Sequence, residues 1–274
     1  MHLTAGFSSL GCPDLSLEET LALAVRHRIP AVELRALGGS TDLPACWERL
    51  HGTPAALAAS LRENPVCIVS LDTSLRLIDG TAADREACLR FVPWAEALGI
   101  PRLRVFDGGR SFDDGELAQA LGALKWWEKL RHDHGWTVDL MVETHDSLIT
   151  SAAVQRLTAA APGTAILWDA HHTWRKGGES PVATWTAIRS SVCQIHVKDS
   201  VSGAAAGAPY RYVLPGSGEF PMRPLVAALS AGAFAGPVCL EWEKLWHPEL
   251  GSLDEALTAA NQCNWWGREA ADSG

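Results

Sequence analysis

Short apolar runs alternate along the chain with longer segments whose apolar residues recur at helical spacing. Eight of the apolar runs have the length of a strand, and each is followed by a helical pattern. Because strands that alternate with helices form parallel sheets, this pattern indicates an α/β fold. The eight expected strands are Leu3–Phe7, Ala31–Leu34, Val66–Leu71, Leu103–Phe106, Val138–Glu143, Ala165–Asp169, Val192–Val197 and Pro237–Glu241.

Capping residues mark where several of the expected helices begin. Ser16, followed three residues later by Glu19, forms a capping box before the first helix. Thr81 and Asp84 open another helix, which runs to Leu98 and stops at a glycine. The remaining expected helices cover Pro54–Arg62, Gly115–His132, Ser151–Ala160 and Pro181–Ser190, and two more begin near Met222 and Ser252.

Eight strand–helix units in 274 residues predict a closed (β/α)8 TIM barrel, with residues 1–274 forming a single domain. A doubly wound open sheet is the main alternative, and such a sheet usually carries a Gly-rich phosphate-binding turn after its first strand. Gly6 and Gly11 form neither a GxGxxG turn nor a P-loop. The long irregular stretch Ser200–Pro221 is expected to be a lid or substrate loop, with an insertion of no function as the alternative.

The composition is that of a globular protein, with 47% hydrophobic and 20% charged residues. The net charge of −9 and the lack of any Lys/Arg run argue against nucleic acid as a partner. Seven scattered Cys without a CxxC pair indicate reduced thiols and a cytoplasmic location. The N-terminus has no signal-peptide pattern and no stretch approaches about 18 apolar residues, so no membrane span is expected.

Five of the expected strands end in an ionisable residue: Glu33, Glu143, Asp169, His196 and Glu241. In a barrel of this kind the catalytic groups lie at the C-terminal ends of the strands. Buried carboxylates and imidazoles are costly unless they are paired or bind a metal. Alternation places the residue two positions later on the same face, so we expect a shared polar mouth. These second members are Arg35, His145, Lys198 and Glu243.

Glu143, Asp169, His196 and Glu241 end four consecutive strands, the fifth to the eighth. Three carboxylates and one imidazole suit a divalent ion such as Mn²⁺, Mg²⁺ or Co²⁺. Without a cation these acids would repel one another. For each residue alone, a helix cap or a surface ion pair is the alternative. Glu33 stands apart from the four, and a salt bridge with an arginine is as well supported there as a substrate contact.

The motifs around these residues, VETH, WDAHH, IHVKD, GSGEFP and LEWE, resemble those of the sugar phosphate isomerase/epimerase group of xylose isomerase-like barrels. This group includes ketose 3-epimerases and inosose isomerases and dehydratases, and the resemblance covers nearly the whole chain. It implies one divalent ion, Mn²⁺ first with Mg²⁺, Co²⁺ and Zn²⁺ as alternatives, held by Glu143, Asp169, His196 and Glu241. It also implies that Glu143 and Glu241 are acid/base catalysts on opposite sides of a bound sugar.

The same resemblance implies a set of substrate contacts. A His three residues after the metal-binding Asp touches substrate in this group, which selects His172 over His171. A Lys two residues after the metal-binding His matches Lys198. The GSGEFP segment has backbone N–H groups suited to a phosphate, although a free sugar or inositol is at least as well supported. The remaining expected contacts are Glu33, His145 and Arg211.

The chain departs from two other branches of the same superfamily. The endonuclease branch needs additional His ligands on the third and fourth strands, where this chain has Asp72, Ser74, Phe106 and Asp107. The Asp-x-His that follows the seventh strand in that branch is also missing, so DNA repair is not expected. The two-metal pattern of acids and a Lys found in aldose isomerases is not visible either.

The sequence therefore predicts a divalent-metal-dependent isomerase or epimerase of a sugar or related polyol that works through an enediolate. A lyase or dehydratase acting on a keto-sugar or keto-inositol shares the first half of that chemistry and stays open. A non-catalytic sugar-binding barrel is the third hypothesis, which the Glu143 and Glu241 pair disfavours. The expected partners are a small-molecule sugar or polyol and a second copy of the chain in a homodimer.

Overall fold

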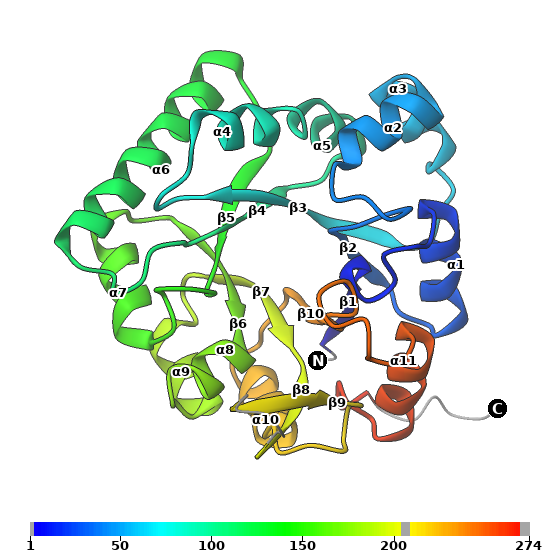
Figure 1. The fold of residues 1–274 in the computed structure, drawn as a ribbon, viewed down its shortest axis with the longest axis vertical. Helices are drawn as coiled ribbons and strands as arrows, with labels where there is room; N and C mark the ends of the chain where they lie inside the picture. Colours follow the sequence, from blue (N-terminus) through cyan, green and yellow to red (C-terminus); the bar gives the residue numbers. More distant parts are fainter. Residues whose placement is uncertain (1–2, 204–208, 269–274) are drawn as a thin grey trace.

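The structure is a computed structural model that describes residues 3–203 and 209–268. Eight parallel strands close into a barrel in the order β1-β10-β7-β6-β5-β4-β3-β2 (Figure 1). The predicted (β/α)8 barrel is confirmed, and the doubly wound open sheet is excluded. The barrel strands are β1 (Thr4–Ser8), β2 (Ala31–Leu34), β3 (Cys67–Arg76), β4 (Arg102–Phe106), β5 (Asp139–Glu143), β6 (Ala165–Asp169), β7 (Val192–Val197) and β10 (Pro237–Leu240).

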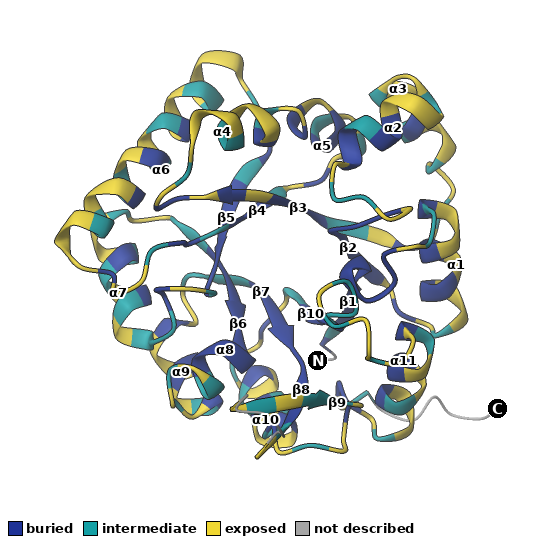
Figure 2. Ribbon diagram, in the orientation of Figure 1, coloured by how far each residue is buried: buried dark blue, intermediate teal, exposed yellow. Residues whose placement is uncertain are grey.

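Helices surround the barrel and turn their exposed faces outward, while the strands are largely buried (Figure 2). Within residues 3–203 and 209–268, no helix is long and apolar enough to cross a membrane. The helices are η1 (Ser9–Gly11), α1 (Leu17–Arg26), α2 (Leu43–His51), α3 (Pro54–Ser60), α4 (Ala82–Leu89), α5 (Val92–Leu98), α6 (Asp114–His134), α7 (Ser151–Ala160), α8 (Ala170–Arg175), α9 (Pro181–Ile188), α10 (Met222–Ala231) and α11 (Leu253–Gln262).

The predicted helix starts rest on hydrogen bonds that the structure contains. Ser16 accepts a bond from the backbone N–H of Glu19, whose carboxylate accepts one from the N–H of Ser16, so the capping box before α1 is confirmed. Thr81 and Asp84 form the same box before α4. These local bonds satisfy N–H groups that a helix start leaves without an intrahelical partner.

The helix expected from Thr81 to Leu98 is two helices, α4 and α5, so the prediction of one continuous helix is wrong. Pro93 lies in the first turn of α5. Proline has no N–H to donate to the carbonyl of Leu89, and its ring clashes with a carbonyl four residues earlier. The chain therefore turns at Arg90 and Phe91 and starts a new helix.

The sequence analysis missed helix α2, although its ends carry ordinary local signals. Asp42 accepts a hydrogen bond of 3.2 Å from the backbone N–H of Ala45, and Pro44 lies in the first turn. Gly52 ends the helix with a φ of +76°, a conformation that favours glycine. These three residues identify the helix once they are read together.

The stretch Ser200–Pro221 contains two strands in the part that the structure describes, so the expectation that it is irregular throughout is wrong, although residues 214–221 form no helix or strand. Strands β8 (Asp199–Ser202) and β9 (Tyr210–Val213) pair antiparallel, with Val201 opposite Arg211. Tyr210 and Tyr212 are half-buried and Arg211 between them is exposed, as in a strand with one covered face. Residues 204–208 lie outside the described residues. The role of this hairpin as a lid or substrate loop stays a prediction.

The core of the barrel has an apolar part and a polar part. Phe7, Leu34, Val105 and Trp168 are among the apolar residues with at most 1% exposure that join the strands to the helix layer. Toward the C-terminal ends of the strands, charged and polar side chains are buried instead. These are Glu33, Asp72, Arg104, Glu143, Asp169, Gln194, His196 and Lys198, with at most 2% exposure each. Burial of so many charges indicates a functional region.

Candidate active site

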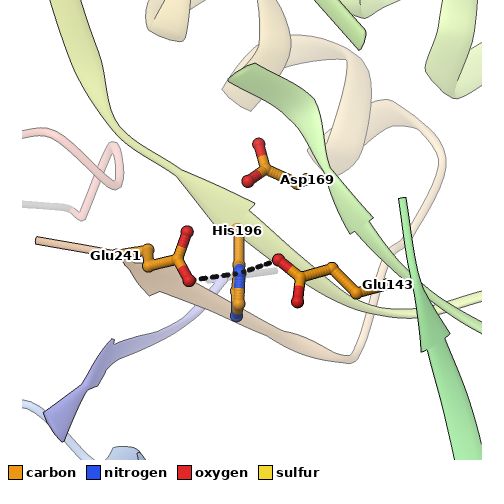
Figure 3. A group of neighbouring side chains, drawn as sticks. All are labelled: Glu143, Asp169, His196 and Glu241. Atoms are coloured by element: carbon orange, nitrogen blue, oxygen red, sulfur yellow. Dashed lines mark ion pairs between the residues drawn. The ribbon is translucent and has the colours of Figure 1, made fainter. Parts of the chain in front are cut away.

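The C-terminal ends of four neighbouring strands bring the predicted metal ligands together. Glu143, Asp169, His196 and Glu241 each offer a ligand atom, and these atoms lie within 4.8 Å of one another (Figure 3). All four residues are buried, with Glu241 the most exposed at 6%. β5, β6, β7 and the residue after β10 supply them, because these strands are neighbours in the barrel. The predicted convergence of the four residues is therefore present in the structure.

The imidazole of His196 lies between the two glutamates. Its Nδ1 atom is 3.2 Å from Oε1 of Glu143 and 3.4 Å from Oε1 of Glu241 (Figure 3). Its Nε2 atom points the other way and lies 2.8 Å from Oε2 of Glu33. The ring thus presents one nitrogen to the cluster and the other to the barrel interior.

The donor set fits a divalent cation. Both carboxylate oxygens of Glu143, Oδ2 of Asp169 and Nδ1 of His196 are buried, and none makes a hydrogen bond of ordinary geometry among the residues that the structure describes, although Arg104, Lys198 and His172 approach the carboxylates. Buried polar atoms in native proteins are nearly always satisfied. Carboxylate oxygens and one imidazole nitrogen are ligands that Mn²⁺, Mg²⁺, Co²⁺ and Zn²⁺ accept. A cation bound here would satisfy these atoms and relieve the repulsion between the acids.

Arg104 supports Glu143 from the neighbouring strand β4, a role that the sequence analysis missed. Its Nε atom lies 3.2 Å from Oε2 of Glu143, and its Nη1 donates a bond of 3.0 Å to the carbonyl of Thr73. Its Nη2 lies 3.7 Å from Oδ2 of Asp72. The sequence did contain a signal for this role, because Arg104 is a charged residue inside the apolar run LRVF. That run forms β4, which pairs with β5, the strand that ends in Glu143.

Lys198 lies within the cluster, as its predicted substrate role requires, and it contacts the expected metal ligands. Its ammonium group is 2.8 Å from Oδ2 of Asp169, forms an ion pair with Glu241, and is 2.6 Å from Oε1 of Glu243. Tyr212 of β9 donates a hydrogen bond of 2.8 Å to the same oxygen of Glu243. The hairpin is thereby connected to the cluster through Glu243 and Lys198.

Burial and neighbouring charges set the pKa values of the carboxyl groups in the cluster. Burial alone raises the pKa of Glu143, but the guanidinium of Arg104 and the imidazole of His196 together more than offset this, so the net shift is downward. Burial also opposes ionisation of Glu241, yet the ammonium of Lys198 and the imidazole of His196 together hold its pKa well below the usual value. The pKa of Asp169 rises to about 6, because burial outweighs the attraction of Lys198. Both glutamates are held as carboxylates, which can bind a cation or accept a proton.

The histidines after β5 and β6 divide between the cluster and the hairpin. His172 is buried, and its Nδ1 lies 3.1 Å from Oδ2 of Asp169. His145 is half-buried, and its ring meets that of His172 edge-on at 4.9 Å. His171 turns away toward the hairpin, where its Nε2 lies 2.8 Å from the hydroxyl of Ser200. His145 and His172 therefore lie beside the cluster, and His171 packs under the hairpin.

Two predicted substrate contacts lie elsewhere. Glu33 is fully buried beneath His196 and shows no ion pair with Arg35 within the described residues; Arg35 donates to the carbonyl of Asp72 instead. Arg211 is exposed on the face of β9 opposite to that of its neighbours Tyr210 and Tyr212, whose rings contact His171. The structure does not bring either residue to the open side of the cluster. Their substrate roles stay predictions without support from the geometry.

The backbone N–H groups considered for a phosphate are bound to a side chain of this protein. The carboxylate of Asp199 accepts hydrogen bonds of 2.9 Å from the N–H groups of Gly216 and Gly218 and one of 3.1 Å from that of Phe220. A Cβ atom at Gly218 would lie 2.1 Å from Oδ1 of Asp199, so only glycine fits there. The GSGEFP segment thus anchors the hairpin to the barrel.

The model of the xylose isomerase-like TIM barrel family matches residues 21–263 of the chain. No curated protein sequence matches the chain significantly. The matched range includes all four residues of the cluster and most of the barrel.

Solved structures share the fold at low sequence identity. The probable 3-DHS dehydratase AsbF of Bacillus anthracis, involved in petrobactin synthesis, has a TM-score of 0.76 and is 16% identical, covering 96% of this chain and 99% of its own. The IOLI protein, solved with a bound zinc atom, has a TM-score of 0.73 and 13% identity, covering 96% of both chains. A D-tagatose 3-epimerase-like protein has a TM-score of 0.68 and 14% identity, covering 97% of both. At such identities the likeness establishes the fold alone.

Proposed function

The chain belongs to the xylose isomerase-like TIM barrel family, and we propose that it is a divalent-metal-dependent isomerase or epimerase of a sugar or related polyol. One observation carries the proposal: Glu143, Asp169, His196 and Glu241 converge, and three of them have buried atoms without hydrogen-bond partners in the described structure. Relatives of the same fold described as an epimerase-like protein and a probable dehydratase support an enzyme rather than a non-catalytic barrel.

The four residues of the cluster would hold the ion. When bound, Mn²⁺, or alternatively Mg²⁺, Co²⁺ or Zn²⁺, supplies Lewis-acid polarisation of the substrate carbonyl. The zinc in the IOLI protein supports a divalent ion at this type of site. Asp169 is fixed for this role by its place at the start of α8, where its carboxylate accepts a bond of 2.8 Å from the N–H of His172.

Glu143 and Glu241 would move the protons. They lie on either side of His196, so a substrate bound over the ring has one carboxylate near each face (Figure 3). One glutamate removes a proton from the carbon next to the carbonyl, and the other, once it has taken up a proton from solvent, delivers that proton to the opposite face or the adjacent carbon. Arg104 and Lys198 keep the two groups ionised and oriented before the reaction.

His145, His172 and Lys198 would orient the hydroxyl groups of the substrate. They are the predicted substrate contacts that lie beside the cluster. Tyr212 adds a phenol group on the hairpin side, because its hydroxyl reaches Glu243 next to Lys198. Each of these side chains combines a hydrogen-bonding group with an apolar or partly apolar part. Such side chains suit a substrate with many hydroxyl groups.

Incubation with a panel of ketoses and keto-inositols in heavy water tests the proposal. We expect Mn²⁺-dependent uptake of deuterium at one carbon, with the carbon skeleton and all hydroxyl groups retained. Loss of water from the substrate would instead assign the lyase, which shares the first proton removal. Failure to exchange any substrate, together with failure of the purified protein to bind any divalent ion, would refute the metal-dependent enzyme.

A further inference from the structure

The polar contact below the cluster involves Glu33, a predicted substrate contact that is fully buried within the barrel. Its Oε2 lies 2.8 Å from Nε2 of His196, and neither side chain has any exposed area. The side-chain amide of Gln194 donates to the same oxygen, so Oε2 acts as an acceptor and Nε2 of His196 is its second donor. The other ring nitrogen, Nδ1, faces Oε1 of Glu143 and Oε1 of Glu241.

Glu33 is itself held in place from two directions. Gln194, two residues before His196 on β7, donates its side-chain amide to Oε2 of Glu33 and lies 3.4 Å from the hydroxyl of Ser70. The backbone of Glu33 belongs to β2, which pairs with β1 and β3. The carboxylate therefore has little freedom to turn away from the imidazole.

We infer that Glu33 is a positioning residue, which accepts the Nε2–H of His196 and so directs the lone pair of Nδ1 at a divalent cation held by Glu143, Asp169 and Glu241. This inference rests on the proposed function, since it assigns Nδ1 as a metal ligand. A carboxylate on the second nitrogen of a metal-binding imidazole fixes the tautomer and the ring orientation and raises the basicity of the ligand.

Two other roles for Glu33 are less compatible with its surroundings. A substrate contact would need access to the barrel mouth, and Glu33 lies on the far side of the His196 ring with no exposed area. A second cation between Glu33, Asp72 and His196 would lie beside two guanidinium groups. Arg104 is 3.7 Å from Oδ2 of Asp72, and Arg35 donates to the backbone carbonyl of the same residue.

Titration of the metal-stripped protein with Mn²⁺, followed by electron paramagnetic resonance, tests the inference directly. We expect Glu33→Leu to weaken Mn²⁺ binding by about 100-fold and Glu33→Gln by about tenfold, the two ends of the range for such carboxylates. Asp107→Asn is the matched control, because it removes a buried carboxylate at the end of a barrel strand that accepts bonds from the backbone N–H groups of Ser147 and Leu148. Its Kd should equal that of the wild type. Wild-type affinity in both Glu33 variants overturns the inference.

Nuclear magnetic resonance of the histidine ring protons and nitrogens gives a second measurement that does not depend on the metal. The wild type should show a strongly hydrogen-bonded Nε2–H of His196, and Glu33→Leu should lose it while Asp107→Asn keeps it. An identical resonance in Glu33→Leu overturns the inference. If the wild type binds no divalent ion, the proposed function fails, whereas this resonance still decides whether Glu33 holds the ring. If Glu33→Leu does not fold, the tenfold change in Glu33→Gln decides.

Discussion

The two sides of the polar barrel interior differ in how their charges balance. On the side of β2, β3 and β4, two carboxylates lie among two guanidinium groups. On the side of β5, β6, β7 and β10, four carboxylates share one ammonium group and one imidazole. The first set is Glu33, Asp72, Arg35 and Arg104. The second set is Glu143, Asp169, Glu241 and Glu243, with Lys198 and His196.

This difference distinguishes two roles within one barrel: the first set of residues supports its neighbours, and the second set carries the chemistry. The balanced side has as many basic as acidic groups, so it needs no added ion to balance its charge, which suits groups that hold others in place. The acid-rich side has an excess of negative charge that only an added cation would neutralise. A protein keeps such an imbalance where function requires it and accepts lower stability there. Mutations on the two sides should therefore change different properties.

The largest expected effect is on turnover, from changes on the acid-rich side. Glu143→Gln and Glu241→Gln each remove a proton-transfer group, so kcat should fall by about 10²–10⁴-fold. Folding should be retained, because loss of a negative charge relieves repulsion in this region. Steady-state kinetics and circular dichroism measure the two properties. Glu128→Gln on the exposed face of α6 is the control. Near-normal turnover in both glutamate variants would contradict the assignment.

A change on the balanced side should lower stability as well. Arg104→Met leaves buried carboxylates of Glu143 and Asp72 without their guanidinium, so the free energy of unfolding should fall by roughly 3–5 kcal/mol. Arg102→Met on the same strand removes a partly exposed ion pair with Asp139 at 3.8 Å and should lose at most about 1 kcal/mol. Denaturant unfolding distinguishes them. Equal small losses would mean that the balanced side does not support the fold.

Metal addition tests the charge excess itself. Mn²⁺ at 100 times its Kd should raise the free energy of unfolding of the metal-stripped protein by about 2.7 kcal/mol, and a chelator should reverse the gain. Glu241→Gln removes one ligand charge and should lose most of the gain at the same Mn²⁺ concentration. Thermal unfolding with and without the ion provides the measurement. A gain as large in Glu241→Gln as in the wild type would place the ion somewhere else.

The smallest expected effect concerns the hairpin, which contacts the acid-rich side through Tyr212 and Glu243. Hydrogen bonds from Ser202 and Arg175 lower the pKa of exposed Glu219 from 4.5 to about 2. A depressed acid pKa stabilises the folded state above its unfolded value, and that contribution disappears as pH falls toward 2. The wild type should therefore melt slightly above Glu219→Gln near neutral pH, and the difference should vanish in acid. A difference that grows on acidification would contradict this pairing.

Much of the fold followed from local sequence signals. The strand ends at Glu143, Asp169 and Val197 were predicted at their observed positions, because an apolar run followed by a polar residue marks where a barrel strand leaves the core. The break before α5 and the start of α2 also had local signals, Pro93 and Asp42, which the analysis did not weigh. The hairpin of β8 and β9 was not predicted, because Gly- and Ala-rich sequence surrounds its short strands.

The sequence could not separate the residues at the barrel mouth from those beneath it. Glu33 and Glu143 carry the same signal, an acid at the end of an apolar run, yet only Glu143 joins the four-residue cluster. Lys198 was expected beside the substrate, and its spacing did not reveal that it reaches Asp169 and Glu241. Arg211 matched a position in the chain, but the face of β9 on which it lies depends on the hairpin register.

The order of apolar and polar residues determined the barrel and the residues that end its strands, because burial patterns and helix caps act over a few neighbouring positions. Tertiary structure alone decided which of those side chains touch. Glu33 and His196 are 163 residues apart in the chain, and closure of the barrel brings them within hydrogen-bond distance. Contacts of that kind depend on strand order and register around the whole cylinder, which no short segment specifies.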